Sequence, residues 1–155
     1  MKYDDASWHS GGNFPADLPS QAGATHIGMF VAWALLHGLA GDIHTREFPE
    51  PLARLREGKI TPGQFFLEVC DGKFTDEDLS EVGNRFAEYY YERDDRRGTY
   101  FADYAGRVGT EPPSIYHVPD TWETYERLAP IIQQRFEEWL RDALTGLLID
   151  PGYQQ

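Results

Sequence analysis

Basic residues and cysteine are both scarce in this 155-residue chain. It has 14 Lys and Arg against 26 Asp and Glu, a formal net charge of −12. A field of this sign repels phosphate backbones and anionic lipid headgroups, so we expect neither nucleic acid nor a membrane surface as a partner. It favours a basic protein partner, or solubility alone. The single cysteine, Cys70, excludes an intrachain disulfide, and its apolar surroundings (GQFFLEVC) predict a buried structural thiol.

Long apolar runs and a secretory pattern are also missing. The longest apolar stretch, IGMFVAWALL, is about half the length that spans a bilayer. The first residues, MKYDDASW, carry two acids where a secretory signal has a basic region followed by an apolar one. We therefore expect a cytoplasmic protein.

Apolar and polar residues alternate with a period of two for no more than about four residues at a time, which disfavours β-strands. Helical patterns recur instead. The sequence therefore predicts an all-α fold, with residues 1–155 as a single compact domain of five or six helices. Residues 1–22 are rich in Gly, Pro, Ser and Asp, and they predict an irregular N-terminal arm packed on the body through its aromatic residues.

Two helices are predicted with particular features. The run 24–37 is apolar on almost every face, which is typical of a buried central helix. Gly28 and Ala32 lie four residues apart on it and would let a neighbouring element approach closely. A second helix is expected to begin with Thr61 as its N-cap and Pro62 at its first position.

Two further helix starts are indicated by acidic capping patterns. Thr75 and Asp78 are spaced as in a capping box and predict the start of a long helix. Asp120 and Glu123 predict the start of the last helix in the same way, and Pro130 should kink or split that helix.

No motif for catalysis, metal binding or a cofactor is present, so we expect no catalytic residue, no metal and no cofactor. None of the five histidines has a metal-ligand spacing with another. One alternative remains open, because the arm could fold over the start of the central helix. It is a small-molecule site or a metal-assisted enzyme site built from Asp4, Asp5, His9 and His26.

The same arm also has a purely structural interpretation. Tyr3, Trp8 and Phe14 would pin it over the buried helix, and Asp4 or Asp5 would satisfy the imidazole of His26 or the first amides of that helix.

A tyrosine-rich, acidic segment, EYYYERDD, is the best candidate for a protein-binding surface. Three consecutive tyrosines cover most of the circumference of a helix, so at least one should be exposed. Exposed tyrosines beside charged residues are typical of protein-binding hot spots. The alternative is a core aromatic pair with one tyrosine reaching the surface. The candidate residues of this surface are Tyr90, Tyr91, Glu92, Asp94 and Asp95.

The N-terminal block KYDDASWH…GATHIGMF resembles the opening signature of a family of small acidic bacterial proteins of unassigned function. Such proteins resemble immunity proteins of interbacterial toxin systems, which bind and neutralise a secreted effector. This resemblance implies a non-catalytic protein that binds a protein effector, one with a basic surface to match the acidic, tyrosine-rich segment. It assigns a role to no individual residue.

Overall fold

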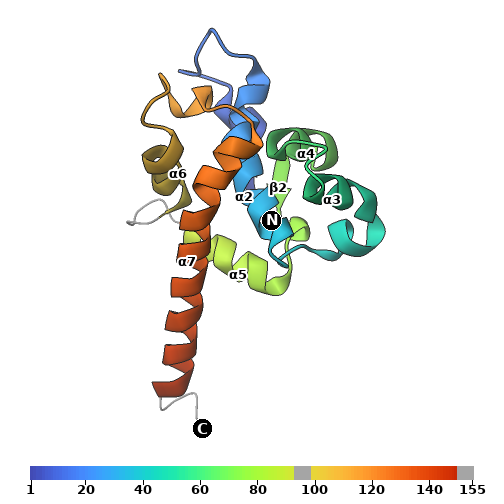
Figure 1. Ribbon diagram of the computed structural model, residues 1–155, viewed down its shortest axis with the longest axis vertical. Coiled ribbons are helices and arrows are strands. Elements are labelled where there is room, and N and C mark those ends of the chain that lie inside the picture. Colours follow the sequence, from blue (N-terminus) through green and yellow to red (C-terminus); the bar gives the residue numbers. More distant parts are fainter. Residues whose placement is uncertain (93–98, 150–155) are drawn as a thin grey trace.

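Helix α2 (Thr25–Leu36) passes through the middle of the molecule, and every residue in it except Leu36 is buried. The computed structural model describes residues 1–92 and 99–149, and the other elements surround α2 (Figure 1). The predicted all-α class and the buried central helix are confirmed. The remaining elements are β1 (Lys2–Asp5), α1 (Ala6–His9), η1 (Ser20–Ala24), η2 (Ile43–Glu47), α3 (Pro49–Arg56), α4 (Pro62–Val69), β2 (Lys73–Thr75), η3 (Asp76–Asp78), α5 (Glu81–Tyr90), α6 (Tyr100–Val108), η4 (Ile115–His117) and α7 (Trp122–Ile149).

The N-terminal arm contains a short strand that the sequence did not predict. Within the described residues the only strands are β1 and β2, which pair in antiparallel fashion. Lys2 lies opposite Thr75 and Asp4 opposite Phe74, with an irregularity between these two pairs. Three consecutive residues of β1 are buried, so exposure does not alternate along this strand. A strand this short, without alternation, gives no recognisable sequence pattern.

Close packing of α4 against α2 depends on Gly28. A Cβ atom at this position would lie 2.7 Å from the carbonyl oxygen of Pro62 and 3.0 Å from Cα of Gly63. The close approach expected at Gly28 is therefore confirmed, and the neighbour is the first turn of α4. The predicted start of α4 is confirmed as well, because Thr61 Oγ1 accepts from the amide of Gln64 in a full capping box.

The other two predicted helix starts are wrong in an informative way. Thr75 and Asp78 do form a capping box, but it begins the single turn η3, and α5 starts later, with Ser80 as its cap. Asp120 does not cap α7. Its carboxylate instead accepts from the hydroxyl of Thr61 at 2.6 Å and from the amide of Gly63 at 2.8 Å, at the start of α4.

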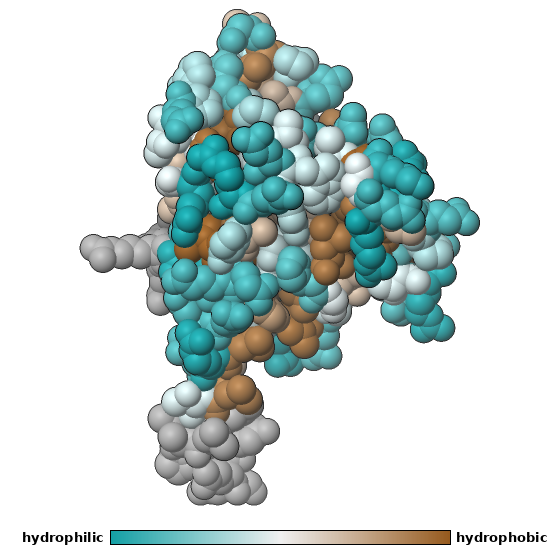
Figure 2. Space-filling view, in the orientation of Figure 1, coloured by the Kyte–Doolittle hydropathy of each residue, from teal (hydrophilic) through white to brown (hydrophobic). Residues whose placement is uncertain are grey.

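Helix α7 is the long element that runs along one side of the molecule in Figure 1. It continues through Pro130 without being split. Arg135 on α7 binds the carboxylate of Asp103 on α6 through two nitrogens, at 2.9 and 3.1 Å. Figure 2 shows hydrophilic side chains over most of one face, with hydrophobic ones beside α5 and along the lower part of α7. The exposed apolar residues of these two helices include Val82, Leu140 and Leu144.

Aromatic side chains fill the core around Phe30 of α2. The ring of Tyr91 lies 5.0 Å from it and that of Tyr100 lies 5.3 Å from it, measured between centroids. Phe74 and Phe86 complete the cluster at 5.8 and 6.1 Å. Most of the tyrosines in the segments around Tyr91 and Tyr100 are therefore part of the core.

Candidate functional site

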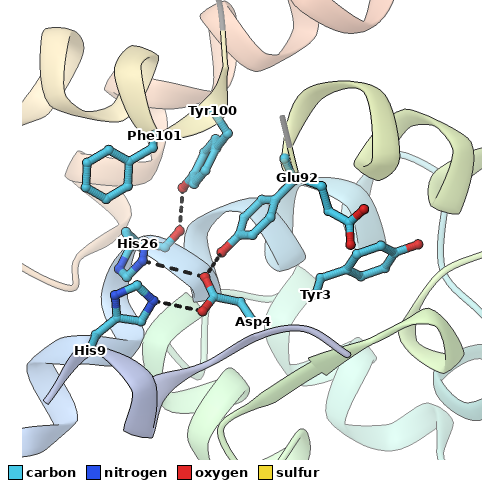
Figure 3. A pocket seen from close by; sticks show the side chains of 8 residues that line it. Tyr3, Asp4, His9, His26, Glu92, Tyr100 and Phe101 are labelled. Carbon is cyan, nitrogen blue, oxygen red and sulfur yellow. Dashed lines mark hydrogen bonds and ion pairs between the residues drawn. The ribbon is translucent and has the colours of Figure 1, made fainter. Parts of the chain in front are cut away.

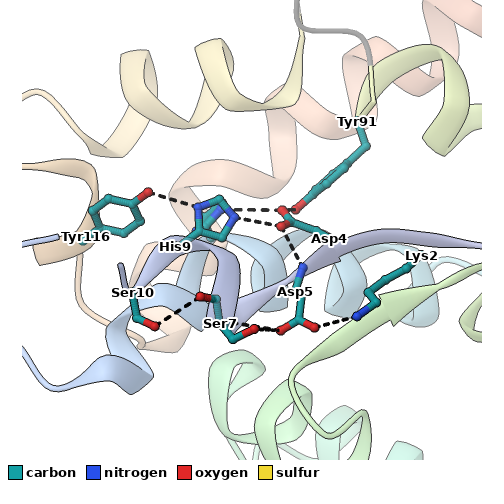
Figure 4. A network of polar contacts seen from close by, with 9 residues as sticks. Lys2, Asp4, Asp5, Ser7, His9, Ser10, Tyr91 and Tyr116 are labelled. Atoms are coloured by element: carbon teal, nitrogen blue, oxygen red, sulfur yellow. Dashed lines mark hydrogen bonds and ion pairs between the residues drawn. The ribbon is translucent and has the colours of Figure 1, made fainter. Parts of the chain in front are cut away.

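Strand β1 and helix α1 bring the side chains of Asp4 and His9 next to His26, in the first turn of α2. Asp4 and Asp5 point apart, as neighbours on a strand do. Asp5 binds Lys2 Nζ at 2.8 Å and caps α1 by accepting from the amide of Ser7 at 2.9 Å (Figure 4). Asp4 turns the other way, towards His9 and His26 (Figure 3). Asp5, one of the four residues of the alternative site, therefore lies outside the group formed by the other three.

His9 connects Asp4 to η4, the short turn that precedes α7. Its Nε2 lies 2.8 Å from Asp4 Oδ1, and its Nδ1 lies 3.0 Å from the hydroxyl of Tyr116 (Figure 4). Its ring also meets that of His26 edge-on, with centroids 4.4 Å apart. Both ring nitrogens of His9 are thus held by oxygen atoms, so the imidazole has a defined orientation.

His26 is buried, with 2% of its surface exposed, and its Nε2 has no hydrogen-bond partner. That atom lies 3.8 Å from Asp4 Oδ2, too far for a hydrogen bond. The expectation that Asp4 or Asp5 satisfies this imidazole is therefore wrong. Burial, and then the neighbouring His9, lowers the pKa of His26 to about 3, although Asp4 opposes the shift. The ring is neutral at pH 7, with an unused polar atom beside Asp4.

Two tyrosines from distant segments fix the remaining polar atoms. The hydroxyl of Tyr91 donates to Asp4 Oδ2 at 2.6 Å, and that of Tyr100 donates to the backbone carbonyl of His26. Burial tends to raise the pKa of Asp4, but hydrogen bonds from His9 and Tyr91 outweigh it and hold that pKa below its usual value. Asp4 is therefore an ionised carboxylate whose two oxygens are both oriented.

These groups line a pocket of about 480 Å³. One ligand atom each from Asp4, His9 and His26 lies within 4.8 Å of the other two. Two imidazoles and one carboxylate form a donor set suited to a divalent transition metal. The other residues that line the pocket are Tyr3, Tyr91, Glu92, Tyr100 and Phe101 (Figure 3).

The tyrosines proposed for a protein-binding surface face inwards. Tyr90 is 1% exposed, and its hydroxyl donates to Asp103 at 2.7 Å, so its side chain offers no surface to a partner. Tyr91 is held by Asp4, and the exposed residue Glu92 lies at the pocket. Asp94 and Asp95 lie outside the described residues. The exposed tyrosine of the three is Tyr89, in agreement with the expectation that at least one reaches the surface.

Sequence reasoning missed the two tyrosines that hold the polar group in place. Tyr91 is 87 residues from Asp4 in the chain, and Tyr116 is 107 residues from His9. No local spacing could have paired them. Trp8 was expected to pin the arm, but it is 59% exposed, and its ring lies 5.2 Å from Lys2 Nζ. Tyr3 is buried as expected, and its hydroxyl donates to the side chain of Asn84 at 2.7 Å.

A family profile described as a domain of unknown function, DUF7832, matches residues 2–118. The chain belongs to this family. The matched region contains the whole group of Asp4, His9 and His26 together with Tyr91 and Tyr116, whereas α7 lies beyond it. No curated protein and no solved structure matches the chain. Among the described residues, every helix is too short or too polar to cross a membrane.

Proposed function

We propose that this protein binds a divalent transition-metal ion through Asp4, His9 and His26, and that the ion holds a small polar or anionic ligand in the adjoining pocket. The observation that carries the proposal is the buried Nε2 of His26, which has no hydrogen-bond partner and lies 3.8 Å from Asp4 Oδ2. Leaving a buried polar atom unpaired costs roughly 1–3 kcal/mol. A ligand that uses this atom would recover that cost.

The surrounding hydrogen bonds support a metal-binding role. A histidine that ligates a metal usually donates its other ring N–H to an oxygen, and a ligating carboxylate is usually hydrogen-bonded as well. With Nε2 of His9 on the metal, its Nδ1–H would donate to the hydroxyl of Tyr116, 3.0 Å away. Tyr91 already donates to Asp4 at 2.6 Å. Tyr116 and Tyr91 are thus placed to orient two of the three ligands, His9 and Asp4.

Three protein ligands leave coordination positions for a further molecule. The pocket of about 480 Å³ adjoins the three ligand atoms and has aromatic walls, including Tyr100 and Phe101. A ligand with a polar group on the metal and an apolar part against these rings fits this combination. The function supported best is therefore metal-dependent binding of a small molecule.

The test is a calorimetric titration with Zn²⁺ of the wild type and of a His9→Gln, His26→Gln double variant. The double variant is expected to bind one equivalent fewer than the wild type. His117→Gln, which changes a histidine bound to Asp17 away from the pocket, should keep the wild-type stoichiometry. Asp4→Asn, nearly the same in shape, should weaken the site at least tenfold. Equal stoichiometry in the wild type and the double variant would refute the proposal.

Capture of a basic protein, as by an immunity protein, is a second candidate function. The formal net charge of −12 favours it, because such a field accelerates association with a basic partner and makes the rate sensitive to salt. The resemblance of the N-terminal block points the same way. The test measures the binding of the wild type, and of a variant with Glu92, Asp94 and Asp95 changed to Lys, to the products of the neighbouring genes. Unchanged affinity would remove this surface from consideration.

A further inference from the structure

A second group of side chains that can ligate a metal shares no residue with the first site, and the two pockets have no lining residue in common. His44 comes from η2, Cys70 is the residue that ends α4, and Asp78 belongs to η3. His44 Nε2 lies 2.8 Å from Asp78 Oδ1, and Cys70 Sγ lies 3.7 Å from the same oxygen. One ligand atom from each residue lies within 4.8 Å of the other two.

The fold holds these three segments together tightly. The amide of Gly41 donates to the carbonyl of Asp78 at 2.9 Å, and a Cβ atom at Gly41 would overlap the carbonyl oxygen of Glu77. This close approach places His44, three residues further on, against Asp78. The ring of His44 also packs on Phe65 of α4, with centroids 5.6 Å apart. Backbone contacts therefore hold the segments of His44 and Asp78 together, and the ring of His44 is packed against α4, which ends at Cys70.

Capping alone does not account for this arrangement. As a cap, Asp78 uses only Oδ2, which accepts from the amide of Thr75 at 2.9 Å. Its other oxygen gathers an imidazole and a thiol from two separate segments, neither of which η3 needs. Imidazole, thiolate and carboxylate are together the ligand types of zinc sites in proteins.

The group opens onto a pocket of about 500 Å³ that is mostly apolar. All three side chains line it, and the apolar part of the wall includes Ile43, Phe48, Pro51 and Val69. Ligand atoms that face such a pocket can be reached from solvent, and a metal held by three of them keeps a position open towards it.

A nucleophilic cysteine is a poorer explanation of the same residues. Burial, and then the neighbouring Asp78 carboxylate, raises the pKa of the Cys70 thiol well above its usual value. His44 is hydrogen-bonded to Asp78, and the thiol of Cys70 donates to the same carboxylate, which is a weak base for a thiol. A divalent cation would reverse this situation, because its charge stabilises both the thiolate and the carboxylate.

We propose that His44, Cys70 and Asp78 form a second metal site, selective for a soft or borderline divalent ion such as Zn²⁺ or Cd²⁺, with an open position facing the apolar pocket. On binding, the thiol proton of Cys70 leaves to solvent and sulfur binds the metal. The proton with which His44 Nε2 donates to Asp78 is exchanged through solvent for one on Nδ1, so that Nε2 can bind the metal. The thiolate makes the site softer than Asp4, His9 and His26, and thus favours softer ions.

Titration with Co²⁺ tests this site through its sulfur ligand. Coordination by thiolate produces a charge-transfer absorption band in the near ultraviolet. Since Cys70 is the chain's single cysteine, the band reports this site alone. The wild type should develop the full band within two equivalents of Co²⁺, one for each proposed site, and Cys70→Ser should lose it. Asp4→Asn should retain it, which separates this test from that of the first site.

Two further variants guard against a misleading result. His44→Gln keeps the sulfur and should weaken Co²⁺ binding at least tenfold, while Glu81→Gln, in an exposed ion pair with Arg85 on α5, should leave the affinity unchanged. Absence of the band in the wild type would overturn the proposal. So would a band of undiminished affinity in His44→Gln, which would mean that the sulfur binds cobalt without the imidazole of His44. Circular dichroism of each variant confirms that it is folded.

Discussion

Asp4 connects the elements that form the first pocket. Its oxygens accept from the amide of Asp5 and from Tyr91, and Oδ1 lies 2.8 Å from Nε2 of His9. His26 lies beside this group without a hydrogen bond from its Nε2. Because this buried imidazole is neutral in the folded protein, the free energy of unfolding depends on pH. This dependence can be measured without knowing the ligand.

The metal-free protein is expected to lose stability as the pH falls below about 6.5. Burial lowers the pKa of His26 to about 3 in the folded state from 6.5 in the unfolded chain, so between these values only the unfolded chain binds the proton. The stability that the neutral ring of His26 contributes is complete above pH 6.5. It declines towards pH 3, by several kcal/mol in all. Urea denaturation with a chelator, between pH 7 and 5, measures the slope.

The change in the free energy of unfolding with pH should become shallower in His26→Gln and should persist in His117→Gln. A wild-type protein whose free energy of unfolding is the same at pH 7 and pH 5 would show that His26 is not buried as a neutral ring.

Among the elements, local patterns predicted the helices better than their caps. The apolar run of α2 and the capping box of α4 each depend on residues close together in the chain, and both are confirmed. Asp120 shows why the predicted cap of α7 failed. A carboxylate near a helix start can accept amides from any helix that packs beside it, and the fold placed it at α4. The same reason explains the site, where Asp4, His9 and His26 were candidates but Tyr91 was assigned to a protein-binding surface instead.

Contact between α2 and α4 should be sensitive to a single methyl group at Gly28. A Cβ atom there would lie 2.7 Å from the carbonyl oxygen of Pro62, which is backbone and cannot move aside alone. Gly28→Ala is therefore expected to lower the free energy of unfolding by roughly 1–3 kcal/mol. Gly106→Ala is the matched control, because a Cβ there meets nothing within 4 Å on helix α6.

Chemical denaturation of both variants is the measurement. Gly106→Ala should be neutral or stabilising by up to about 1 kcal/mol, because alanine favours helix. Equal free energies of unfolding for the two variants would contradict the close packing of α2 and α4.

On the scale of the whole molecule, helix α7 lies beyond the region that the family profile matches and packs against helices inside that region. The match ends at residue 118, and α7 begins at Trp122. Arg135 of α7 holds Asp103 of α6, which also accepts from the hydroxyl of Tyr90 on α5. One carboxylate thus connects three helices, two of which lie in the matched region.

Breaking this connection should destabilise the molecule. Arg135→Gln removes the cation from a partly buried Asp103, for which we expect a loss of about 1–3 kcal/mol, between the values of exposed and buried pairs. Asp103→Asn should cost a similar amount, and the double variant less than the sum of the two. Thermal or urea denaturation gives the coupling energy. Strictly additive losses would show that the ion pair contributes nothing to the attachment of α7.

Whether Asp4, His9 and His26 hold a metal ion can be seen by anomalous X-ray diffraction from crystals grown with Zn²⁺, recorded at the zinc absorption edge. We expect a peak of anomalous density bounded by Asp4 Oδ2, His9 Nε2 and His26 Nε2, facing the pocket beside Tyr100. The same crystals made with the His9→Gln, His26→Gln variant should lack that peak. A wild-type crystal with zinc bound elsewhere, and none between these three residues, would contradict this expectation.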